Sequence, residues 1–504
     1  MPNANLYALF ESSFPSDMHQ AAFEGPDINT WSFAELASTS AQMAHLMVEL
    51  GAKPGDRVAI QVAKSVEAVV LYLACLRTGL VYLPLNTAYK AAEIEYFLGD
   101  ATPTLVVCDP ASIDSIKPLA KAVDVKEVLT LDAQGNGSLI DWIEGNPKTY
   151  ETVASSSDDL AAILYTSGTT GRSKGAMLTH NNLSSNAKSL HRAWHFEEGD
   201  VLLHALPIFH VHGLFVALHC ALLNGSKIIF LTKFDPKAVI NALPRATVFM
   251  GVPTFYVRLL ADADFTKENC SNIRLFTAGS APLLEETFNA FAERTGHVIL
   301  ERYGMTEAGM ITTNPYEKER KAGTVGMPLD NDVRIVSEKG EPLAEGDIGI
   351  LEIKGPNVFK GYWQMPEKTA AEFRDDGYFI TGDMCQKGGD GYYRIVGRSK
   401  DLIISGGYNV YPKEIESFID DMPGVEESAV VGRPHPDFGE AVVAYVVADG
   451  SIPALTAENI IQFVKEKLAN FKVPKDVFLL DALPRNTMGK VQKKELRDRA
   501  AANQ

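Results

Sequence analysis

The chain has 504 residues, of which 46% are hydrophobic and 22% are charged, so it is typical of a globular protein that buries a large core. Its net charge of −17 disfavours binding to nucleic acid or to an anionic membrane, because both need a basic protein surface. The longest apolar runs are too short to span a bilayer, and the five cysteines show neither C-x-x-C spacing nor an even count. These features predict a cytoplasmic protein without a zinc site or a disulfide framework.

The first 150 residues alternate between short apolar runs and amphipathic stretches. Residues 32–51 have helical spacing and end at a glycine, a common residue at helix C-termini. Residues 57–62 and 104–109 are predicted buried strands, and residues 65–78 between them are a predicted helix. This β-α-β alternation predicts a parallel sheet covered by helices.

The same alternation continues to about residue 326. Further apolar runs of strand length are each followed by polar or glycine-rich residues: AAILYT, KIIFL, TVFMGV, IRLFTAG and HVILERYG. Ligands of open α/β sheets bind beyond the carboxyl ends of such strands, so we expect functional residues there.

After residue 326 the predicted strands become short and are separated by glycine and aspartate turns, which predicts a β-rich subdomain. Residues 399–504 then carry their own alternation of helix and strand. We therefore predict an α/β protein with a large N-terminal domain of several subdomains, residues 1–398. A small, mobile α+β C-terminal domain, residues 399–504, is expected to follow.

The stretch TSGTTGRSKG, residues 166–175, follows a predicted strand and combines glycines with hydroxyl and cationic side chains. Glycines let backbone N–H groups approach phosphate oxygens, although the spacing differs from G-x-x-x-x-G-K-[ST]. A flexible surface loop is the alternative that such clusters usually represent. The residues predicted to hold phosphate are Thr166, Ser167, Gly168, Thr169, Thr170, Gly171 and Lys174.

Motifs spread over nearly the whole chain occur in a fixed order: YTSGTTGRSKGAMLTH, ALPIFHVHGLF, ERYGMTE, YFITGD, GRSKDLIISGGYNVYPKEIE and PRNTMGK. Together they resemble the core motifs of the acyl-adenylate-forming superfamily, which includes acyl-CoA synthetases, luciferases and the adenylation domains of peptide synthetases. The resemblance implies the adenylating-enzyme fold and a reaction in two steps. A carboxylate attacks the α-phosphate of ATP to give acyl-AMP and pyrophosphate, and a thiol, usually that of coenzyme A, displaces AMP. Residues 166–175 would orient the β- and γ-phosphates.

The resemblance also assigns the residues of ERYGMTE. Tyr303 would offer a flat face to adenine, and Gly304 beside it belongs to the same nucleotide site. Thr306 would give a hydroxyl to the α-phosphate, and Glu307 a hard oxygen ligand to Mg²⁺. Thr169 is the second expected metal contact.

Later motifs supply the ribose site and the hinge. Asp383, in YFITGD, would accept hydrogen bonds from the ribose hydroxyls, and Arg398 would donate to the same sugar. Lys400, in GRSKD, occupies the hinge position about which the C-terminal domain would rotate between the two steps. Gly406 and Gly407 would then line the tunnel for the pantetheine arm of coenzyme A, since glycines leave room for a thin chain.

Near the C-terminus, Lys490 follows a glycine in PRNTMGK. By resemblance, this lysine enters the active site during adenylation and bridges the carboxylate and the α-phosphate. Its exposure makes it a target for a lysine acetyltransferase, which would remove the charge.

Two arginines point to an acidic substrate. Arg302 precedes the motif tyrosine, where many relatives carry a small residue, and Arg258 lies next to the predicted acyl pocket. A buried guanidinium without a partner costs several kcal/mol, so the pair implies an anion that a second carboxylate can supply and a fatty tail cannot. Ser280 and His212 are expected to line the same cavity. His210 would be the gate between the acyl and nucleotide pockets.

The segments VPTFYVRLL, ERYGMTE and HVHGLF are similar to those of malonyl- and methylmalonyl-CoA synthetases. We therefore expect ligation of malonate or methylmalonate to coenzyme A, driven by ATP and Mg²⁺. Three alternatives stay open: Arg258 lies on a helix surface, an arginine pairs with an acid such as Glu301, or His210 is an ordinary core histidine. The functional alternatives are a ligase for another small or aryl acid, or an inactive nucleotide-binding protein of the same fold.

Overall fold

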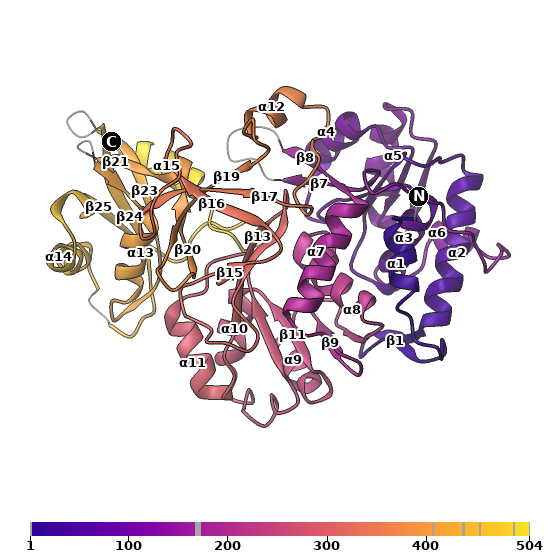
Figure 1. Cartoon of the computed structure of the whole chain (residues 1–504), viewed down its shortest axis with the longest axis horizontal. Helices are drawn as coiled ribbons and strands as arrows, with labels where there is room; N and C mark the ends of the chain where they lie inside the picture. The colour runs from indigo at the N-terminus through magenta and orange to yellow at the C-terminus, as the bar shows by residue number, and fades with distance from the viewer. Residues whose placement is uncertain are drawn as a thin grey trace. The chain divides into compact units, whose positions relative to one another are not determined.

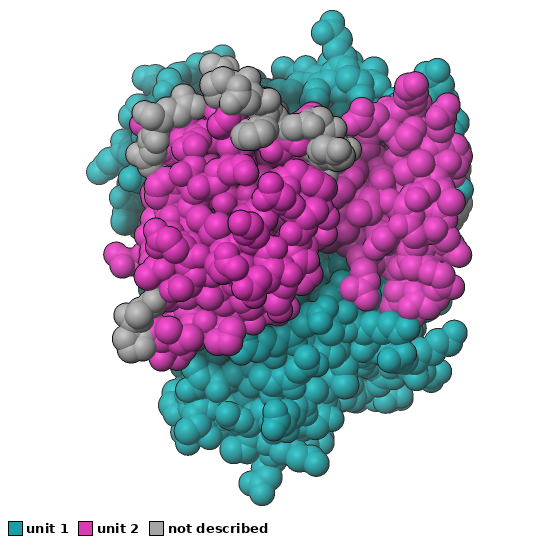
Figure 2. Space-filling view, turned by 90° about the vertical axis from the view of Figure 1, so that its left-hand side faces the viewer, with its two compact units in different colours: residues 1–332, 354–377 teal, residues 333–353, 378–504 magenta. Residues whose placement is uncertain are grey.

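The structure is a computed structural model that describes residues 3–166, 173–405, 408–435, 439–452, 455–486 and 489–502. The chain folds into two compact units, which Figure 2 shows in different colours. The first unit comprises residues 1–332 and 354–377, and the second comprises residues 333–353 and 378–504. The segment 354–377 therefore returns to the first unit after the chain has begun the second.

The first sheet of the first unit is mostly parallel, as the β-α-β alternation predicts. Among the described residues its strand order is β18-β8-β7-β4-β3-β5-β6. Helix α3 (Val66–Thr78) connects β3 to β4 and is buried along almost its whole length, because α2 packs over it. It begins at the N-cap Ser65 and ends at Gly79, whose φ of 70° suits a helix C-terminus. The strands are β3 (Arg57–Gln61), β4 (Val81–Pro84), β5 (Leu105–Cys108), β6 (Glu127–Thr130), β7 (Leu160–Thr166), β8 (Lys174–Thr179) and β18 (Gly361–Tyr362).

The second sheet of this unit has the order β15-β14-β13-β12-β11-β9-β10-β1-β2 in the part of the chain that the structure describes. From β13 to β1 the neighbouring strands run parallel, and antiparallel strands close both edges. The strands are β1 (Ala21–Gly25), β2 (Ile28–Ser32), β9 (Val201–His204), β10 (Lys227–Phe230), β11 (Val248–Gly251), β12 (Leu275–Ala278), β13 (Leu300–Met305), β14 (Gly309–Thr313) and β15 (Met327–Pro328).

Helices cover both sheets. Figure 1 shows α9, α10 and α11 gathered beside β11, where their apolar faces share one buried cluster. Phe276 and Phe291 meet edge to face in that cluster, and Tyr256 of α10 packs against Phe291. The helices of the unit are α1 (Leu6–Glu11), α2 (Phe33–Glu49), α3, α4 (Ala91–Ala101), α5 (Ile113–Lys121), α6 (Ser138–Trp142), α7 (His180–Ala193), α8 (His219–Leu223), α9 (Pro236–Ala242), α10 (Pro253–Leu260), α11 (Glu285–Thr295) and α12 (Pro366–Ala371), with a π-helix η2 (His212–Leu218).

The second unit contains two sheets within its described residues. The order of one is β16-β17-β19-β20, and the other has the path β22-β21-β24-β23 with β25 parallel to β24. The strands are β16 (Asp332–Val336), β17 (Ile348–Lys354), β19 (Phe379–Lys387), β20 (Tyr393–Arg398), β21 (Ile403–Ser405), β22 (Tyr408–Val410), β23 (Val425–His435), β24 (Gly439–Ala448) and β25 (Asp476–Leu480). The helices are α13 (Pro412–Asp420), α14 (Ala457–Lys467) and α15 (Lys493–Ala502).

The predicted α/β class, the parallel sheets and the later β-rich segment are confirmed. The segments 333–353 and 378–398 group with the C-terminal residues, so the compact division falls elsewhere than at residue 398. The predicted boundary at 398, with a hinge at Lys400, concerns movement and stays a prediction. No helix in the described ranges is long and apolar enough to cross a membrane.

Candidate active site

The glycine-rich stretch is flanked by two strands that fix its ends. Thr166 closes β7, Lys174 opens β8, and the two residues are directly paired across the antiparallel ladder. The expected phosphate contacts between them, namely Ser167, Gly168, Thr169, Thr170 and Gly171, lie outside the described residues.

Lys174 lies in a small ionic cluster within the first unit. Its Nζ donates to Oε1 of Glu372 at 3.1 Å and sits 4.0 Å from the centre of the Tyr362 ring. The hydroxyl of Tyr362 lies 2.6 Å from Oε2 of Glu372 and 3.0 Å from Oε1 of Glu307. The structure thus connects Lys174, the predicted phosphate-binding lysine, to Glu307, the predicted Mg²⁺ ligand, through two residues that the motifs did not single out.

The ERYGMTE motif, residues 301–307, forms all but the first residue of β13 and the start of the turn into β14. A Cβ at Gly304 would fall 2.1 Å from the carbonyl oxygen of Gly309, so this close approach of the two strands requires glycine. Tyr303 and Thr306 are half-buried, and Glu307 is buried. The hairpin therefore places four predicted ATP-site residues, including Gly304, within five consecutive positions.

Arg302 is buried on β13, and no carboxylate of the described residues forms an ion pair with it. Within the described residues its Nε and Nη2 atoms have no hydrogen-bond partner. The guanidinium occupies the space beside Gly279, where a Cβ would fall 2.4 Å from Nη1. Burial lowers the pKa of Arg302 to about 10, so the group remains a cation at neutral pH. A buried cation of this kind is costly unless an anion joins it.

Other buried polar atoms belong to the same neighbourhood. The Nδ1 atom of His212 lies 3.2 Å from the hydroxyl of Ser280, and its Nε2 atom has no hydrogen-bond partner among the described residues. Burial, and then the charge of Arg302, hold the pKa of His212 well below its usual value, so its imidazole is neutral. If Ser280 donates to Nδ1, then Nε2 carries a proton that a ligand oxygen can accept. Ser280 and His212, which the sequence assigned to one cavity, are thus in contact, and their role in binding the acyl group stays a prediction.

Arg258 does not share this environment. It is exposed on α10, whose buried residues Pro253, Tyr256 and Leu259 follow at intervals of three. Position 258 falls on the opposite face of the helix, so the argument from a buried guanidinium does not apply to Arg258. Arg258 therefore lies on a helix surface, as the alternative interpretation had it. Its contact with the acyl group stays a prediction.

His210 lies half-buried in the loop that leads into the π-helix η2. Its Nδ1 accepts a hydrogen bond from the backbone N–H of His212 at 3.3 Å. A Cβ at Gly213 would fall 2.0 Å from the carbonyl oxygen of Pro207, so only glycine permits this tight turn. Single π-helical turns are frequent at functional sites, which agrees with a specialised loop here.

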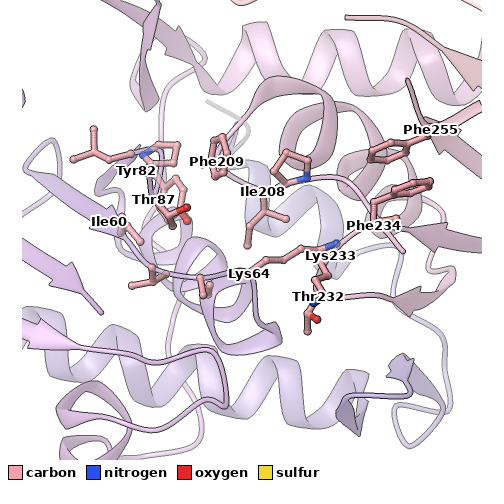
Figure 3. Close-up of a pocket in the computed structure, with 17 residues that line it drawn as sticks. Ile60, Lys64, Tyr82, Thr87, Ile208, Phe209, Thr232, Lys233, Phe234 and Phe255 are labelled. Carbon is pink, nitrogen blue, oxygen red and sulfur yellow. The ribbon is translucent and has the colours of Figure 1, made fainter. Parts of the chain in front are cut away.

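A cavity of about 340 Å³ lies beside the same loop (Figure 3). Its lining is mainly apolar, with Phe209 and Phe255 on its walls and the lysines Lys64 and Lys233 at its polar parts. The Nζ atom of Lys64 lies 2.8 Å from Nδ1 of His204 and donates to two backbone carbonyls, so the protein already occupies its donors. The four predicted acyl-binding residues are not among those that line this cavity.

The second unit brings together the two predicted ribose-binding residues. Asp383 on β19 and Arg398 on β20 are directly opposite in the antiparallel ladder. Arg398 Nε lies 2.6 Å from Oδ1 of Asp383, which is buried, whereas Arg398 is partly exposed. A carboxylate held in this way keeps oxygen lone pairs for the two hydroxyls of a ribose.

Lys400 and Lys490, two further predicted residues of this unit, are exposed. Lys400 lies in a 3-10 turn (Ser399–Asp401), and Lys490 lies in a tight turn where its backbone N–H donates to Oδ1 of Asn486. Gly406 and Gly407, the predicted lining of the pantetheine tunnel, lie outside the described residues.

Tyr362 and Glu372 are the site residues that sequence reasoning missed. Tyr362 follows Gly361 in a short strand, and Glu372 follows a short surface helix, where acidic residues are common. No sequence signal marks either residue, because their meeting with Lys174 depends on the pairing of β18 with β8.

Comparison with known families identifies the class of this site. Residues 10–363 match the AMP-binding enzyme family, and residues 414–490 match the C-terminal domain of AMP-binding enzymes. The chain belongs to the AMP-binding enzyme family. The acyl-adenylate-forming membership inferred from the motifs is thereby confirmed, and with it the adenylating-enzyme fold.

Relatives of this AMP-binding enzyme include proteins named for unlike acids. The solved structure of ATP-bound MatB from Rhodopseudomonas palustris has a TM-score of 0.96 and 53% identity, and the match covers 99% of both chains. A malonate–CoA ligase of Arabidopsis thaliana is 34% identical over 94% of this chain and 85% of its own length. A feruloyl-CoA synthase of Amycolatopsis sp is 36% identical over 93% of both chains. The comparisons therefore support an AMP-forming acyl-CoA ligase and leave its acid to be argued from the site.

Proposed function

We propose that this enzyme joins a short dicarboxylate, malonate or methylmalonate, to coenzyme A through an acyl-AMP intermediate. One oxygen of the proximal carboxylate attacks the α-phosphorus of ATP, and the bond to the bridging oxygen breaks to release pyrophosphate. The thiol sulfur of coenzyme A then attacks the acyl carbon, and AMP leaves. The products are the acyl-CoA thioester, AMP and pyrophosphate.

The observation that carries the choice of acid is the buried guanidinium of Arg302. Its Nε and Nη2 atoms lack partners within the described part of the chain, and a second carboxylate on the substrate can accept from both. In the tautomer in which Ser280 donates to Nδ1, the Nε2–H group of His212 is a further donor in the same neighbourhood. An aryl or aliphatic monocarboxylate would leave the Arg302 charge uncompensated, so the relatives named for such acids are the weaker guide here.

The nucleotide side follows the family assignments. Thr166 and Lys174 would contact the β- and γ-phosphates, and Thr306 the α-phosphate. Tyr303 and Gly304 would lie against adenine. Asp383 and Arg398, already paired, would hold the ribose.

Mg²⁺ fits the donor set around Glu307. Mg²⁺ usually binds through one or two carboxylates together with substrate phosphates and waters. Glu307 is a buried carboxylate, and the hydroxyl of Tyr362 lies between it and a second carboxylate, Glu372. When bound, the ion would neutralise charge on the phosphate oxygens. His210 would gate the passage between the acyl and nucleotide pockets, and Lys490 would reach the α-phosphate during adenylation.

The test measures release of pyrophosphate and AMP with ATP and Mg²⁺ across acetate, propionate, malonate, methylmalonate, succinate, octanoate and benzoate. Each acid is run with and without coenzyme A. We expect turnover that depends on coenzyme A and is confined to malonate and methylmalonate, whose ratio would set the preference between them. A monocarboxylate as the best substrate would refute the dicarboxylate pocket, and the absence of turnover with every acid would refute the ligase.

A further inference from the structure

Glu372 lies directly after α12 and is the meeting point of the ionic cluster in the first unit. Its Oε1 atom accepts from Nζ of Lys174 at 3.1 Å and from Nζ of Lys368 at 2.7 Å. Its Oε2 atom accepts from the hydroxyl of Tyr362 at 2.6 Å. The side chains of Glu372 and Lys174 are each only 20% exposed, whereas that of Lys368 is 47% exposed. The pair with Lys368 is thus a surface ion pair, and the other two contacts are sheltered.

The contact with Glu372 leaves Lys174 able to bind phosphate. An ammonium group has three N–H donors, and Glu372 occupies one of them. The ring of Tyr362, 4.0 Å away, shields another side of the group and attracts its charge. A lysine held between a carboxylate and an aromatic ring loses less rotamer freedom when a ligand arrives, because the freedom has already been lost.

Tyr362 links this lysine to Glu307. β18 pairs antiparallel with β8, and Tyr362 lies opposite Ala176. This pairing brings Tyr362 near Lys174, the first residue of β8. Its single hydroxyl proton faces two carboxylates, at 2.6 Å and 3.0 Å. Removing the charge of Glu372 would therefore change the hydrogen bond between the Tyr362 hydroxyl and Glu307, and it would also remove the ion pair that holds Lys174.

The charges in the cluster agree with this arrangement. Burial works to raise the pKa of Glu372, but hydrogen bonds from Lys368, Tyr362 and Lys174 together hold it below its usual value, so Glu372 is ionised at neutral pH. Burial, followed by the charge of Glu307, raises the pKa of Tyr362 far above its usual value, so its hydroxyl keeps its proton.

We infer that Glu372 is a positioning residue for Mg·ATP, acting on Lys174 through the ion pair and on Glu307 through the hydroxyl of Tyr362. The inference rests on the proposed nucleotide roles of Lys174 and Glu307, but not on malonate as the acid. It assigns to this site a carboxylate that orders Lys174 and Glu307, the two groups proposed to hold Mg·ATP.

Calorimetric titration with Mg·ATP in the absence of any acid tests this role on the full-length protein. We expect Glu372→Gln to raise the Kd for Mg·ATP about tenfold, because Lys174 regains its rotamer freedom. The Kd of Glu372→Asp should lie between those of the wild type and Glu372→Gln. In a Lys174→Ala background, Glu372→Gln should raise the Kd by a clearly smaller factor than in the wild type, because only the route through Tyr362 and Glu307 remains. Lys368→Gln, which removes only the exposed partner of Glu372, should stay within about twofold of the wild type.

A second variant keeps the ion pair and removes the link to Glu307. Tyr362→Phe should raise the Mg²⁺ concentration needed for half-maximal ATP binding about threefold or more, because Glu307 loses the hydrogen bond from the Tyr362 hydroxyl. Additive effects of Glu372→Gln and Lys174→Ala, or a Tyr362→Phe variant with unchanged Mg²⁺ dependence, would overturn the inference. Tighter ATP binding by Glu372→Gln would also overturn it, since Glu372 would then compete with phosphate for Lys174. Failure of the wild type to bind Mg·ATP would instead contradict the proposed function.

Discussion

Replacing Arg302 with methionine is expected to lower kcat/KM for malonate at least about 30-fold, because a charge pair sheltered from water loses one partner. Such truncations cost about 2–5 kcal/mol, and about 2 kcal/mol corresponds to this factor. The same variant should be at least as stable as the wild type without ligands. Methionine fills similar space without a buried charge, and buried charges are often replaced by apolar groups without loss of stability. Steady-state kinetics and the thermal unfolding midpoint provide the two measurements.

The opposite signs of these two effects separate a substrate-binding arginine from a structural one. If Arg302 had a purely structural role, its substitution would lower the stability of the protein. The kcat/KM for malonate would then fall only because part of the enzyme is unfolded. Arg258→Met is the matched control, since Arg258 is exposed on α10. Its kcat/KM should remain within about threefold of the wild type, as for most exposed substitutions. An equal loss in Arg258→Met would return Arg258 to the acyl pocket as a second cation.

Replacing Lys490 with alanine is expected to lower the rate of adenylation about 10²–10³-fold, the range for losing one preorganised donor at a developing charge. The second step should be nearly unaffected, because displacement of AMP by the thiol begins from an acyl-AMP that is already formed. Pyrophosphate exchange measures the first step, and conversion of synthetic malonyl-AMP with coenzyme A measures the second. Acetylation of the same exposed ammonium would remove its charge in the same way.

Lys494→Ala provides the control for this experiment. Lys494 is an exposed lysine four residues further along, and it forms a surface ion pair with Asp498. Both steps should proceed at wild-type rates in this variant. If Lys490→Ala keeps pyrophosphate exchange within about threefold of the wild type, Lys490 has no part in adenylation.

Much of the fold is predictable because apolar periodicity determines which residues are buried. The run at residues 57–62 became β3, the helix expected over 65–78 became α3, and the runs from AAILYT to HVILERYG became strands of the two large sheets. The grouping of 333–353 and 378–398 with the C-terminal residues was not predictable, since it depends on contacts between distant segments. The π-helix at η2 was also missed, because its extra residue per turn has no signal in hydrophobic spacing.

The candidate site divides in the same way. The sequence assigned Asp383 and Arg398 to one ribose, and Ser280 and His212 to one cavity. In the structure the members of each pair are in contact. Arg258 is exposed, which contradicts the expectation that its guanidinium is buried. The spacing of Pro253, Tyr256 and Leu259 marks the buried face of α10, and position 258 falls outside that face. Glu372 could not be found from the sequence, since its partner Lys174 is nearly 200 residues away.

The most direct test compares malonate with malonamate, which has the same shape but a neutral distal amide, as substrates of the wild-type enzyme. If the guanidinium of Arg302 holds the distal carboxylate, kcat/KM for malonamate should be lower by a factor of about 30 or more, the scale for a buried charge left without its partner. The discrimination should collapse in Arg302→Met, which has no charge to pair. Equal kcat/KM values for the two acids in the wild type would contradict the account, because the distal charge would then play no part in recognition.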